Sequence, residues 1–370
     1  MAKLDDLAIG RANNFNLIRM IAATAVLVSH AYPISLGEGA LEPLSLILHF
    51  SLGTLAVLTF FAISGFFISQ SFDRKNGLVD FWVARFLRIY PGLTVVLLLA
   101  ALVLGPIFTT LSKGSYFLQP ATIWYLPRNL SLKWLQDDLP GVFSQNPYGT
   151  PINGSLWSLF YEVACYCIVA IIGTLSLTQR NWTFVSFLVV YGIAYVTLKF
   201  FGGHFLEHGT VANFHELTLP FILGMAFYHF RRILPMNLFA CVILCVATLV
   251  TYDGFWFKEV FVISWCYIIF YLGYLPFARL KVYNHLGDYS YGMYIYAFPC
   301  EQIGAALWKN ISPLALIAIS FPITLIFAMA SWHYMESWAL NHRATMAYWL
   351  RRTFGSAPRF SHKQSPISLS

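Results

Sequence analysis

Long apolar runs, broken by few charged residues, constrain this chain of 370 residues more than any other feature. Hydrophobic residues make up 58% of the sequence and charged residues 11%, whereas an ordinary soluble domain carries about 25% charged residues. This composition excludes a large soluble α/β enzyme and predicts an all-α polytopic membrane protein. Because a helix needs about 20 mostly apolar residues to cross a bilayer, we expect a bundle of about ten transmembrane helices. The candidate spans are 14–33, 50–70, 89–109, 156–175, 182–201, 216–231, 236–252, 258–277, 289–308 and 312–333.

The lysines and arginines gather on alternate sides of these spans, which is the asymmetry that sets orientation in a membrane. One side holds Lys3, Arg11, Arg74, Lys75, Arg85, Arg88, Arg180, Arg231, Arg232, Arg279 and Lys281. The other side holds only Lys113, Arg128, Lys133, Lys258 and Lys309. We therefore expect both termini in the cytoplasm and a multi-pass protein of the cell inner (cytoplasmic) membrane, with lipids as partners. The net charge of +7 is spread between apolar runs, so it does not indicate a nucleic-acid partner.

The domain organisation predicted from the sequence is simple, because no internal repeat is visible. We expect residues 1–340 to form one transmembrane domain. Residues 341–370 are expected to form a short basic cytoplasmic tail. Its last dozen residues are rich in Ser and Pro, so the tail should be partly disordered.

Two ionisable residues lie in the first span, where each is costly unless it has a partner or a function. Arg19 and His30 are eleven residues apart, close to three helical turns, so they share one face at an axial separation of about 16 Å. Arg19 alone would suit a side chain that reaches the membrane surface, and His30 alone would suit a structural histidine. Their common face favours a shared polar cavity.

The segment 83–91, VARFLRIYP, carries a pair of arginines on the expected cytoplasmic side. Arg85 and Arg88 are three residues apart and therefore neighbours on a helix. Two adjacent guanidiniums can clamp a phosphorylated ligand. On the residues alone, ordinary positive charge that sets topology explains the pair better.

A carboxylate and several hydroxyls lie in two later spans. Glu162, in the segment 153–163, is predicted about two turns inside the membrane, where His30 is a candidate partner that it would orient. The alternative for Glu162 is an interhelical hydrogen bond that locks the bundle. The same segment and the ninth span offer polar groups to a ligand or to one another: Asn153, Trp157, Ser158, Ser290, Tyr291 and Tyr294.

Other catalytic or metal-binding patterns are weak. His204 and His208 have a helix-compatible spacing, but no third ligand is evident, so we predict no metal site. A P-loop, a dinucleotide-binding G-x-G-x-x-G motif and a G-x-S-x-G nucleophile elbow are missing from the sequence.

Taken together and in order, these segments resemble the acyltransferase-3 family of integral-membrane acyltransferases. The matching features are Arg19 with His30, the FFAISGFFIS segment, Arg85-x-x-Arg88, and LWSLFYE ending at Glu162. The SYGMYIYAFP segment and Tyr334-Met335-Glu336 add weaker support. The resemblance runs from about residue 12 to 338. Many members carry a histidine where this chain has Ala297, which leaves His30 as the main candidate base.

The resemblance implies a ten-helix enzyme that takes an acyl group from cytoplasmic acyl-CoA, usually acetyl-CoA, and places it on an envelope glycan. We accordingly expect acetyl-CoA as a co-substrate, no permanently bound cofactor, and a glycan or lipid-linked glycan as the acceptor. Arg85 and Arg88 would hold the donor, and His30, with Arg19 and Glu162, would act as the general base or carry the acyl group transiently. Asn153 and Trp157 would help to form the acceptor side.

Two other classes of function remain open at this point. A transporter or flippase of a polar or lipid-linked solute would also place Arg, His and Glu inside the membrane. However, the sequence lacks the repeat symmetry and paired broken helices of many transporters. An enzyme of the same architecture that acylates an amine, or that transfers a succinyl group, fits the same residues.

Overall fold

The computed structural model describes residues 3–7, 13–74, 77–207, 209–275, 283–284 and 286–354. The first half of the chain forms α1 (Leu4–Leu7), α2 (Phe15–Leu36), α3 (Ser45–Leu48), α4 (Leu52–Arg74), α5 (Leu78–Leu99), the π-helical turn η1 (Ala100–Leu104), α6 (Gly105–Phe108), α7 (Lys113–Leu118), α8 (Pro120–Leu130) and α9 (Trp157–Thr174). The second half forms α10 (Asn181–Phe201), the 3₁₀ turn η2 (Gly203–Leu206), α11 (Thr210–His229), α12 (Leu238–Val250), α13 (Phe257–Tyr274), α14 (Ser290–Leu307), α15 (Pro313–Ser331), the π-helical turn η4 (Trp332–Glu336), α16 (Ser337–Asn341) and α17 (Arg343–Phe354). The prediction of an all-helical protein is confirmed for the described residues.

All ten segments predicted as spans are largely helical in their described residues, and seven helices of the described part of the chain are long and apolar enough to cross a membrane. These seven are Phe15–Leu36, Leu52–Arg74, Leu78–Phe108, Trp157–Thr174, Asn181–Phe201, Phe257–Tyr274 and Pro313–Asn341. Of the other three segments, α12 is shorter than a full span, with 13 residues, whereas α11 and α14 do not reach the same apolar character. The protein is therefore a multi-pass membrane protein, while the count of ten spans stays a prediction.

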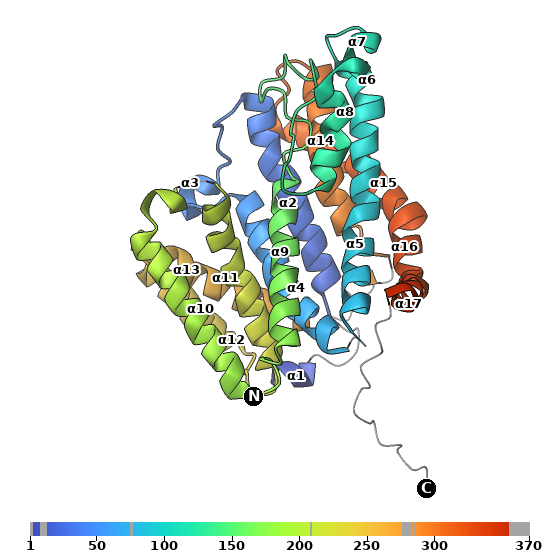
Figure 1. Ribbon diagram of the computed structural model, residues 1–370. Coiled ribbons are helices and arrows are strands. Elements are labelled where there is room, and N and C mark those ends of the chain that lie inside the picture. Colours follow the sequence, from blue (N-terminus) through green and yellow to red (C-terminus); the bar gives the residue numbers. More distant parts are fainter. Residues whose placement is uncertain are drawn as a thin grey trace.

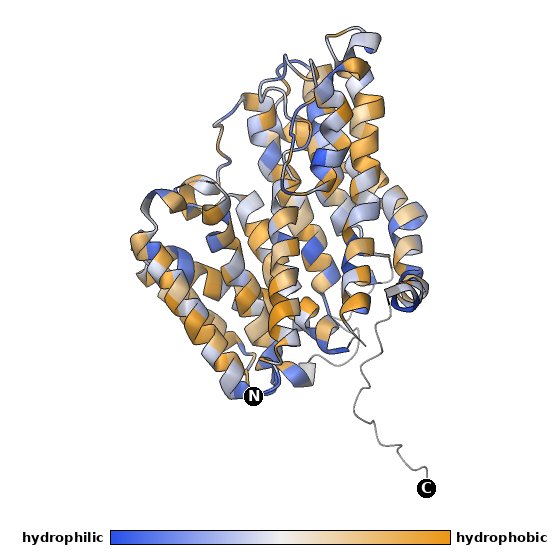
Figure 2. Ribbon diagram, in the orientation of Figure 1, coloured by the Kyte–Doolittle hydropathy of each residue, from blue (hydrophilic) through white to orange (hydrophobic). Residues whose placement is uncertain are grey.

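Apolar side chains on the outside of the bundle explain how lipid serves as its solvent. Only 6% of the apolar window of α10 is buried inside the protein. Its Val190 and Ile193 are 66% and 64% exposed, and the outer face of α10 is largely hydrophobic (Figure 2). Such a helix is stable in a bilayer because its backbone hydrogen bonds are satisfied internally.

Helix α4 lies in the middle of the bundle, between α2, α9 and α11 (Figure 1). Its closest neighbour is α11, and two glycines allow this approach. A Cβ atom on Gly65 would overlap the carbonyl oxygen of Phe221, and one on Gly224 would overlap that of Ala62. Close packing through small residues is the usual way in which membrane helices associate. On the other side of α4, α2 packs against α14 and α15.

The first and last described helices lie at the same end of the bundle (Figure 1). Asp5 of α1 pairs with Arg231, just after α11, at 3.1 Å. Arg351 of α17 pairs with Asp80, at the start of α5, also at 3.1 Å. The segment predicted as a basic tail thus includes a helix packed on the bundle, and its residues 355–370 lie outside the described part. Which side of the membrane this end faces stays a prediction.

Candidate active site

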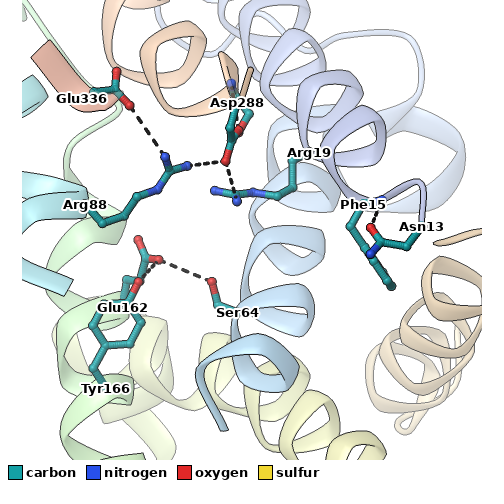
Figure 3. Close-up of polar contacts among 10 residues, drawn as sticks. Asn13, Phe15, Arg19, Ser64, Arg88, Glu162, Tyr166, Asp288 and Glu336 are labelled. Carbon is teal, nitrogen blue, oxygen red and sulfur yellow. Dashed lines mark hydrogen bonds and ion pairs between the residues drawn. The ribbon is translucent and has the colours of Figure 1, made fainter. Parts of the chain in front are cut away.

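Four charged residues from distant parts of the chain meet inside the bundle (Figure 3). Asp288, two residues before α14, accepts hydrogen bonds on Oδ2 from Arg19 of α2 at 2.8 Å and from Arg88 of α5 at 2.7 Å. The other side of the Arg88 guanidinium faces Glu336 of η4 at 3.7 Å. Two cations and two carboxylates therefore form one ionic cluster that joins α2, α5, α14 and the end of α15.

The environment of Asp288 keeps its carboxyl group ionised. Burial alone would raise the pKa of Asp288, but the guanidiniums of Arg19 and Arg88 outweigh it. Ser290 adds hydrogen bonds from its hydroxyl at 2.5 Å and its backbone N–H at 3.3 Å to Oδ1. The net result is a pKa of Asp288 well below its usual range. Because the two guanidiniums compensate its negative charge, the Asp288 carboxylate can stay ionised inside the protein.

A small cavity of about 50 Å³ adjoins the ionic cluster. Arg19 and Arg88 form one part of its wall, and Glu162 of α9 forms another. Glu162 accepts hydrogen bonds from the Tyr166 hydroxyl and, at 3.4 Å, from Ser64 of α4 (Figure 3). The arrangement places permanent cations, a carboxylate and hydroxyls around one space between α2, α4, α5, α9 and α14.

The two arginines predicted to hold the donor, Arg85 and Arg88, contact different partners within the protein. Both residues lie inside α5, which begins at Leu78 rather than near the predicted start at residue 89. Arg88 is ion-paired with Asp288 at 2.7 Å and Glu336 at 3.7 Å. Arg85 instead stacks its guanidinium 5.7 Å from the Tyr166 ring centroid. Their role in holding the donor stays a prediction.

The predicted contact between Glu162 and His30 is not formed. His30 lies eleven residues beyond Arg19 along α2 and does not line the Arg19 cavity. Its ring stands edge-on to Phe298 of α14, with centroids 5.2 Å apart. Among the described residues, its buried Nδ1 has no hydrogen-bond partner. The predicted similar depth was wrong, because Glu162 lies beside the Arg19 cavity and His30 stands about three turns further along α2.

The hydroxyls predicted to contact a ligand are engaged within the protein. Ser158 and Tyr294 are hydrogen-bonded to each other at 2.8 Å, and the Tyr294 hydroxyl also lies 2.5 Å from the carbonyl oxygen of Ser155. Tyr291 donates to the carbonyl oxygen of Ile89 at 2.7 Å. Ser290 bonds to Asp288 rather than to Tyr294. Ser158, Ser290, Tyr291 and Tyr294 all line the Arg19 cavity nevertheless.

Asn153 and Trp157, predicted for the acceptor side, lie apart from this cavity. Asn153 is buried, and its Nδ2 donates to the carbonyl oxygen of Ile295 at 2.8 Å. Trp157 is 36% exposed and stands edge-on to Tyr161. Asn153 thus fixes the loop before α9 onto α14.

Three acidic residues were missed as site residues by the sequence analysis. Asp288 and Glu336 stand at segment ends, where charge is ordinary, and their partners are far away in the sequence. Glu301 of α14 is fully buried, and within the described residues neither carboxylate oxygen has a hydrogen-bond partner. It follows Phe298, the neighbour of His30, by one helical turn. A carboxylate inside the apolar ninth span was the available signal for Glu301.

Of the weak metal pattern at His204 and His208, His208 lies outside the described residues. The side chain of His204 is 93% exposed, and its Nδ1 lies 2.9 Å from Glu207. Within the residues that the structure covers, no group of three His, Cys, Asp or Glu side chains is placed to hold a metal ion.

The structure is a multi-pass helical bundle that holds arginines, carboxylates and a histidine in its interior. It therefore belongs to the class of membrane proteins with a polar site inside the bundle. Residues 13–336 match the model of a family described as an acyltransferase domain. The chain therefore belongs to the acyltransferase-3 family, as its motifs predicted, and is an acyltransferase.

Three relatives are similar over different shares of the chain. The O-acetyl transferase of Shigella phage Sf6 is 29% identical over 342 residues, which cover 88% of this chain and 95% of the relative. Nodulation protein 10 of Rhizobium leguminosarum bv. viciae is 33% identical over 196 residues, 49% of this chain and 48% of the relative. The acyltransferase MdmB of Streptomyces mycarofaciens is 34% identical over 119 residues, 31% of this chain and 27% of the relative. No solved structure matches the chain.

Proposed function

We propose that this protein transfers an acetyl group from cytoplasmic acetyl-CoA to a hydroxyl of a cell-surface or secreted glycan. The observation that carries the proposal is the pairing, on one helix, of Arg19 in the ionic cluster with His30, whose Nδ1 has no partner among the described residues. The name of the Sf6 relative, an O-acetyl transferase, supports an acetyl donor and a hydroxyl acceptor. Membership of an acyltransferase family favours group transfer over the transporter alternative.

In this proposal the ionic cluster shapes the passage of the donor. Asp288 holds the guanidiniums of Arg19 and Arg88 in place at the cavity wall. The present volume of about 50 Å³ is too small for a pantetheine arm, so the donor must widen it on binding. From Arg19 the same face of α2 leads, over about 16 Å, to His30. The thioester would travel along this face.

The chemical step then needs one base and one leaving group. His30 removes the proton from the acceptor hydroxyl while that oxygen attacks the thioester carbonyl carbon. The carbon–sulfur bond breaks, and the thiolate of coenzyme A takes the proton back from the imidazolium. Alternatively, a ring nitrogen of His30 attacks the thioester first and holds the acetyl group until the hydroxyl arrives. A positioned base is typically worth about 10²–10⁴ in rate.

The test uses membranes from cells that express the full chain, given radiolabelled acetyl-CoA and the total surface glycan of the same cells. We expect label in the glycan with the wild-type protein and a loss of about 10²-fold or more with His30→Ala. The matched control is His204→Ala, a histidine whose side chain is 93% exposed, which should retain the wild-type rate. Transfer by His30→Ala at the wild-type rate would overturn the role of His30.

A second measurement separates the two roles of His30. The purified protein is mixed with radiolabelled acetyl-CoA without acceptor and quenched in denaturant. Label that stays on the wild-type chain and is lost in His30→Ala supports a transient acetyl-histidine. An unlabelled chain in an active preparation supports general-base catalysis. If the wild-type membranes of the first assay transfer no label to any glycan, acetyl-CoA is not the donor.

A further inference from the structure

Three buried polar groups lie where α2, α14 and α15 pack against one another. They are Nδ1 of His30 on α2, both carboxylate oxygens of Glu301 on α14, and the hydroxyl of Ser320 on α15. None of them has a hydrogen-bond partner among the residues that the structure describes. Glu301 and Ser320 are 0% exposed, whereas His30 is partly exposed. Buried polar groups are nearly always hydrogen-bonded, so three without partners at one helix junction require an explanation.

Helices α2 and α14 run parallel and in register, which fixes the level of His30 on α14. Asp288, just before α14, meets Arg19 at 2.8 Å. Ten residues after Asp288, Phe298 meets His30, which is eleven residues after Arg19. Glu301 follows Phe298 by three residues, or about 4.5 Å along the axis. Because the Cα–Cβ bonds of a helix tilt toward its amino terminus, the Glu301 side chain leans back toward the level of His30.

Glu301 also lies on the face of α14 that packs on α2. It is one turn from Ala297 on one side and from Ala305 on the other. Ala297 shares a buried cluster with Leu27 of α2, and Ala305 shares another with Ile34 of α2. On α2, the candidate base lies one turn from each of these two residues. The carboxylate and the imidazole therefore occupy the middle of the same helix contact.

Helix α15 closes the third side of this junction. A Cβ atom on Gly304, one turn beyond Glu301, would lie 3.6 Å from the Ser320 hydroxyl oxygen. The missing side chain of Gly304 thus lets α15 approach α14 next to Glu301. A serine hydroxyl is a hydrogen-bond donor that a carboxylate can accept.

Each of the three helices carries a proline at this level, namely Pro33 in α2, Pro299 in α14 and Pro322 in α15. A proline inside a helix removes one backbone hydrogen bond and allows a local bend. Entry of the donor must widen the Arg19 cavity, whose walls include residues of α2 and α14. The prolines give these helices local freedom to adjust when that happens. Catalytic hydrogen bonds are often open in a free enzyme and close only in the complex.

A buried carboxylate is a costly way to fill this space, because water is excluded and no donor offsets its charge. Inside a membrane bundle such a group marks a functional residue. Its natural complement is a hydrogen-bond donor at the same level. Nδ1 of His30 is such a group, and it too lacks a partner in the described part of the chain.

We propose that Glu301 is a positioning residue for His30. In the donor complex its carboxylate accepts a hydrogen bond from Nδ1–H of His30, and the Ser320 hydroxyl donates to the second carboxylate oxygen. The proton on Nδ1 leaves the lone pair of Nε2 free for the acceptor hydroxyl. This inference rests on the proposed function and supplies the partner that Glu162 does not provide.

The carboxylate holds no proton at any point of the reaction. Nε2 takes the hydroxyl proton while the hydroxyl oxygen bonds to the thioester carbonyl carbon. The carbon–sulfur bond then breaks, and the proton passes from Nε2 to the thiolate of coenzyme A. Between these events His30 is an imidazolium, and the negative charge of Glu301 stabilises it.

The first test measures kcat and the KM for acetyl-CoA with purified full-length protein in lipid nanodiscs and the glycan that the wild type acetylates. Glu301→Gln keeps the shape and removes the charge. It should lower kcat by about 10²-fold, leave the KM unchanged and not lower the melting temperature, whereas Glu301→Asp should recover part of the rate. Wild-type kcat in Glu301→Gln would overturn the inference. A fall in kcat that only follows a lower melting temperature would make Glu301 structural and would also overturn it.

Two further variants separate positioning from general damage. Glu259→Gln makes the same change in another buried carboxylate, which is ion-paired with Lys199 at 2.5 Å. This control should lower the melting temperature and retain kcat, the opposite of Glu301→Gln. Because Glu301 acts only through the imidazole, Glu301→Gln should cause no further loss of kcat in a His30→Ala background. A further tenfold loss in that background would contradict the proposed coupling.

A spectroscopic readout keeps this result separate from the proposed function. Nitrogen NMR of histidine-labelled protein with coenzyme A bound reports which ring nitrogen carries the proton, and His30→Ala identifies the signals of His30. We expect the proton on Nδ1 in the wild type and a shift toward Nε2 in Glu301→Gln, even in a preparation that transfers nothing. A wild-type proton on Nε2 would overturn the positioning role. Failure to label any glycan, with the proton on Nδ1, would instead count against the proposed function.

Discussion

Replacing Asp288 by asparagine tests whether one carboxylate holds the ionic cluster together. Asp288→Asn keeps the size of the side chain but removes the charge that contacts Arg19 at 2.8 Å and Arg88 at 2.7 Å. Removing one partner of a buried ion pair typically costs about 3–5 kcal/mol, because the other charge stays buried without compensation. Glu336 remains 3.7 Å from Arg88 and offsets part of the loss. We therefore expect the free energy of unfolding to fall by about 3 kcal/mol.

The assay is denaturant unfolding of the purified protein in detergent micelles at neutral pH. Asp253→Asn is the matched control, because it makes the same chemical change in an exposed pair. The side chain of Asp253 is 66% exposed and that of its partner His49 is 50% exposed. An exposed pair is worth at most about 1 kcal/mol. A loss in Asp288→Asn no larger than in Asp253→Asn would refute the view that the cluster is buried and mutually compensated.

The pH dependence gives a second test of the same reasoning. Because the folded protein lowers the pKa of Asp288, its stabilising contribution is complete above the ordinary carboxyl pKa of about 3.9. It is lost only as the pH falls through the lower, folded-state pKa. The stability difference between wild type and Asp288→Asn should therefore be constant between about pH 5 and 8. A difference that shrinks across this range would contradict the assigned pairing.

Four further substitutions test the packing and the path of the donor. Gly65→Ala should destabilise the protein by about 1–3 kcal/mol in the same unfolding assay, because α11 fills the space, whereas Gly192→Ala, with open space around it, should be neutral or stabilising by up to about 1 kcal/mol. Glu301→Leu should stabilise the fold by about 1–3 kcal/mol by removing a buried carboxylate without a partner among the described residues, and a loss of stability would indicate an unseen partner. Arg85→Ala should mainly raise the KM for acetyl-CoA, whereas Arg88→Ala should mainly lower the free energy of unfolding. If both variants change the KM and the stability to the same extent, the two arginines do not have separate roles.

The helices of this protein could be predicted from its sequence because lipid imposes a length and an apolar composition on each span. The shared face of Arg19 and His30 predicted one polar cavity for both, whereas the cavity beside Arg19 is not lined by His30. Helix α5 begins at Leu78, eleven residues before the predicted start of the third span at residue 89. Arg85 and Arg88 are compatible with the interior of α5 only because partners from other helices surround them, and composition along one segment does not report those partners.

The contacts of the site could not be predicted because they depend on the rotation and order of packed helices. The sequence predicted a similar membrane depth for Glu162 and His30, yet Glu162 accepts hydrogen bonds from Ser64 and Tyr166. Periodicity gives the face of each helix but not the neighbour that the face meets. Asp288 illustrates the same limit, since 269 residues separate it from Arg19.

The spacing of the ionic cluster along the chain also has a consequence during synthesis. Arg88 is made 200 residues before Asp288. At about 5–20 residues per second, the ribosome needs on the order of 10 to 40 seconds to produce the missing carboxylate. Throughout that interval two guanidiniums are in or near the bilayer without their counter-ion, so the early helices must wait at the insertion machinery or at the lipid surface. The amino-terminal half of this enzyme can settle to its final depth only when the carboxy-terminal helices arrive.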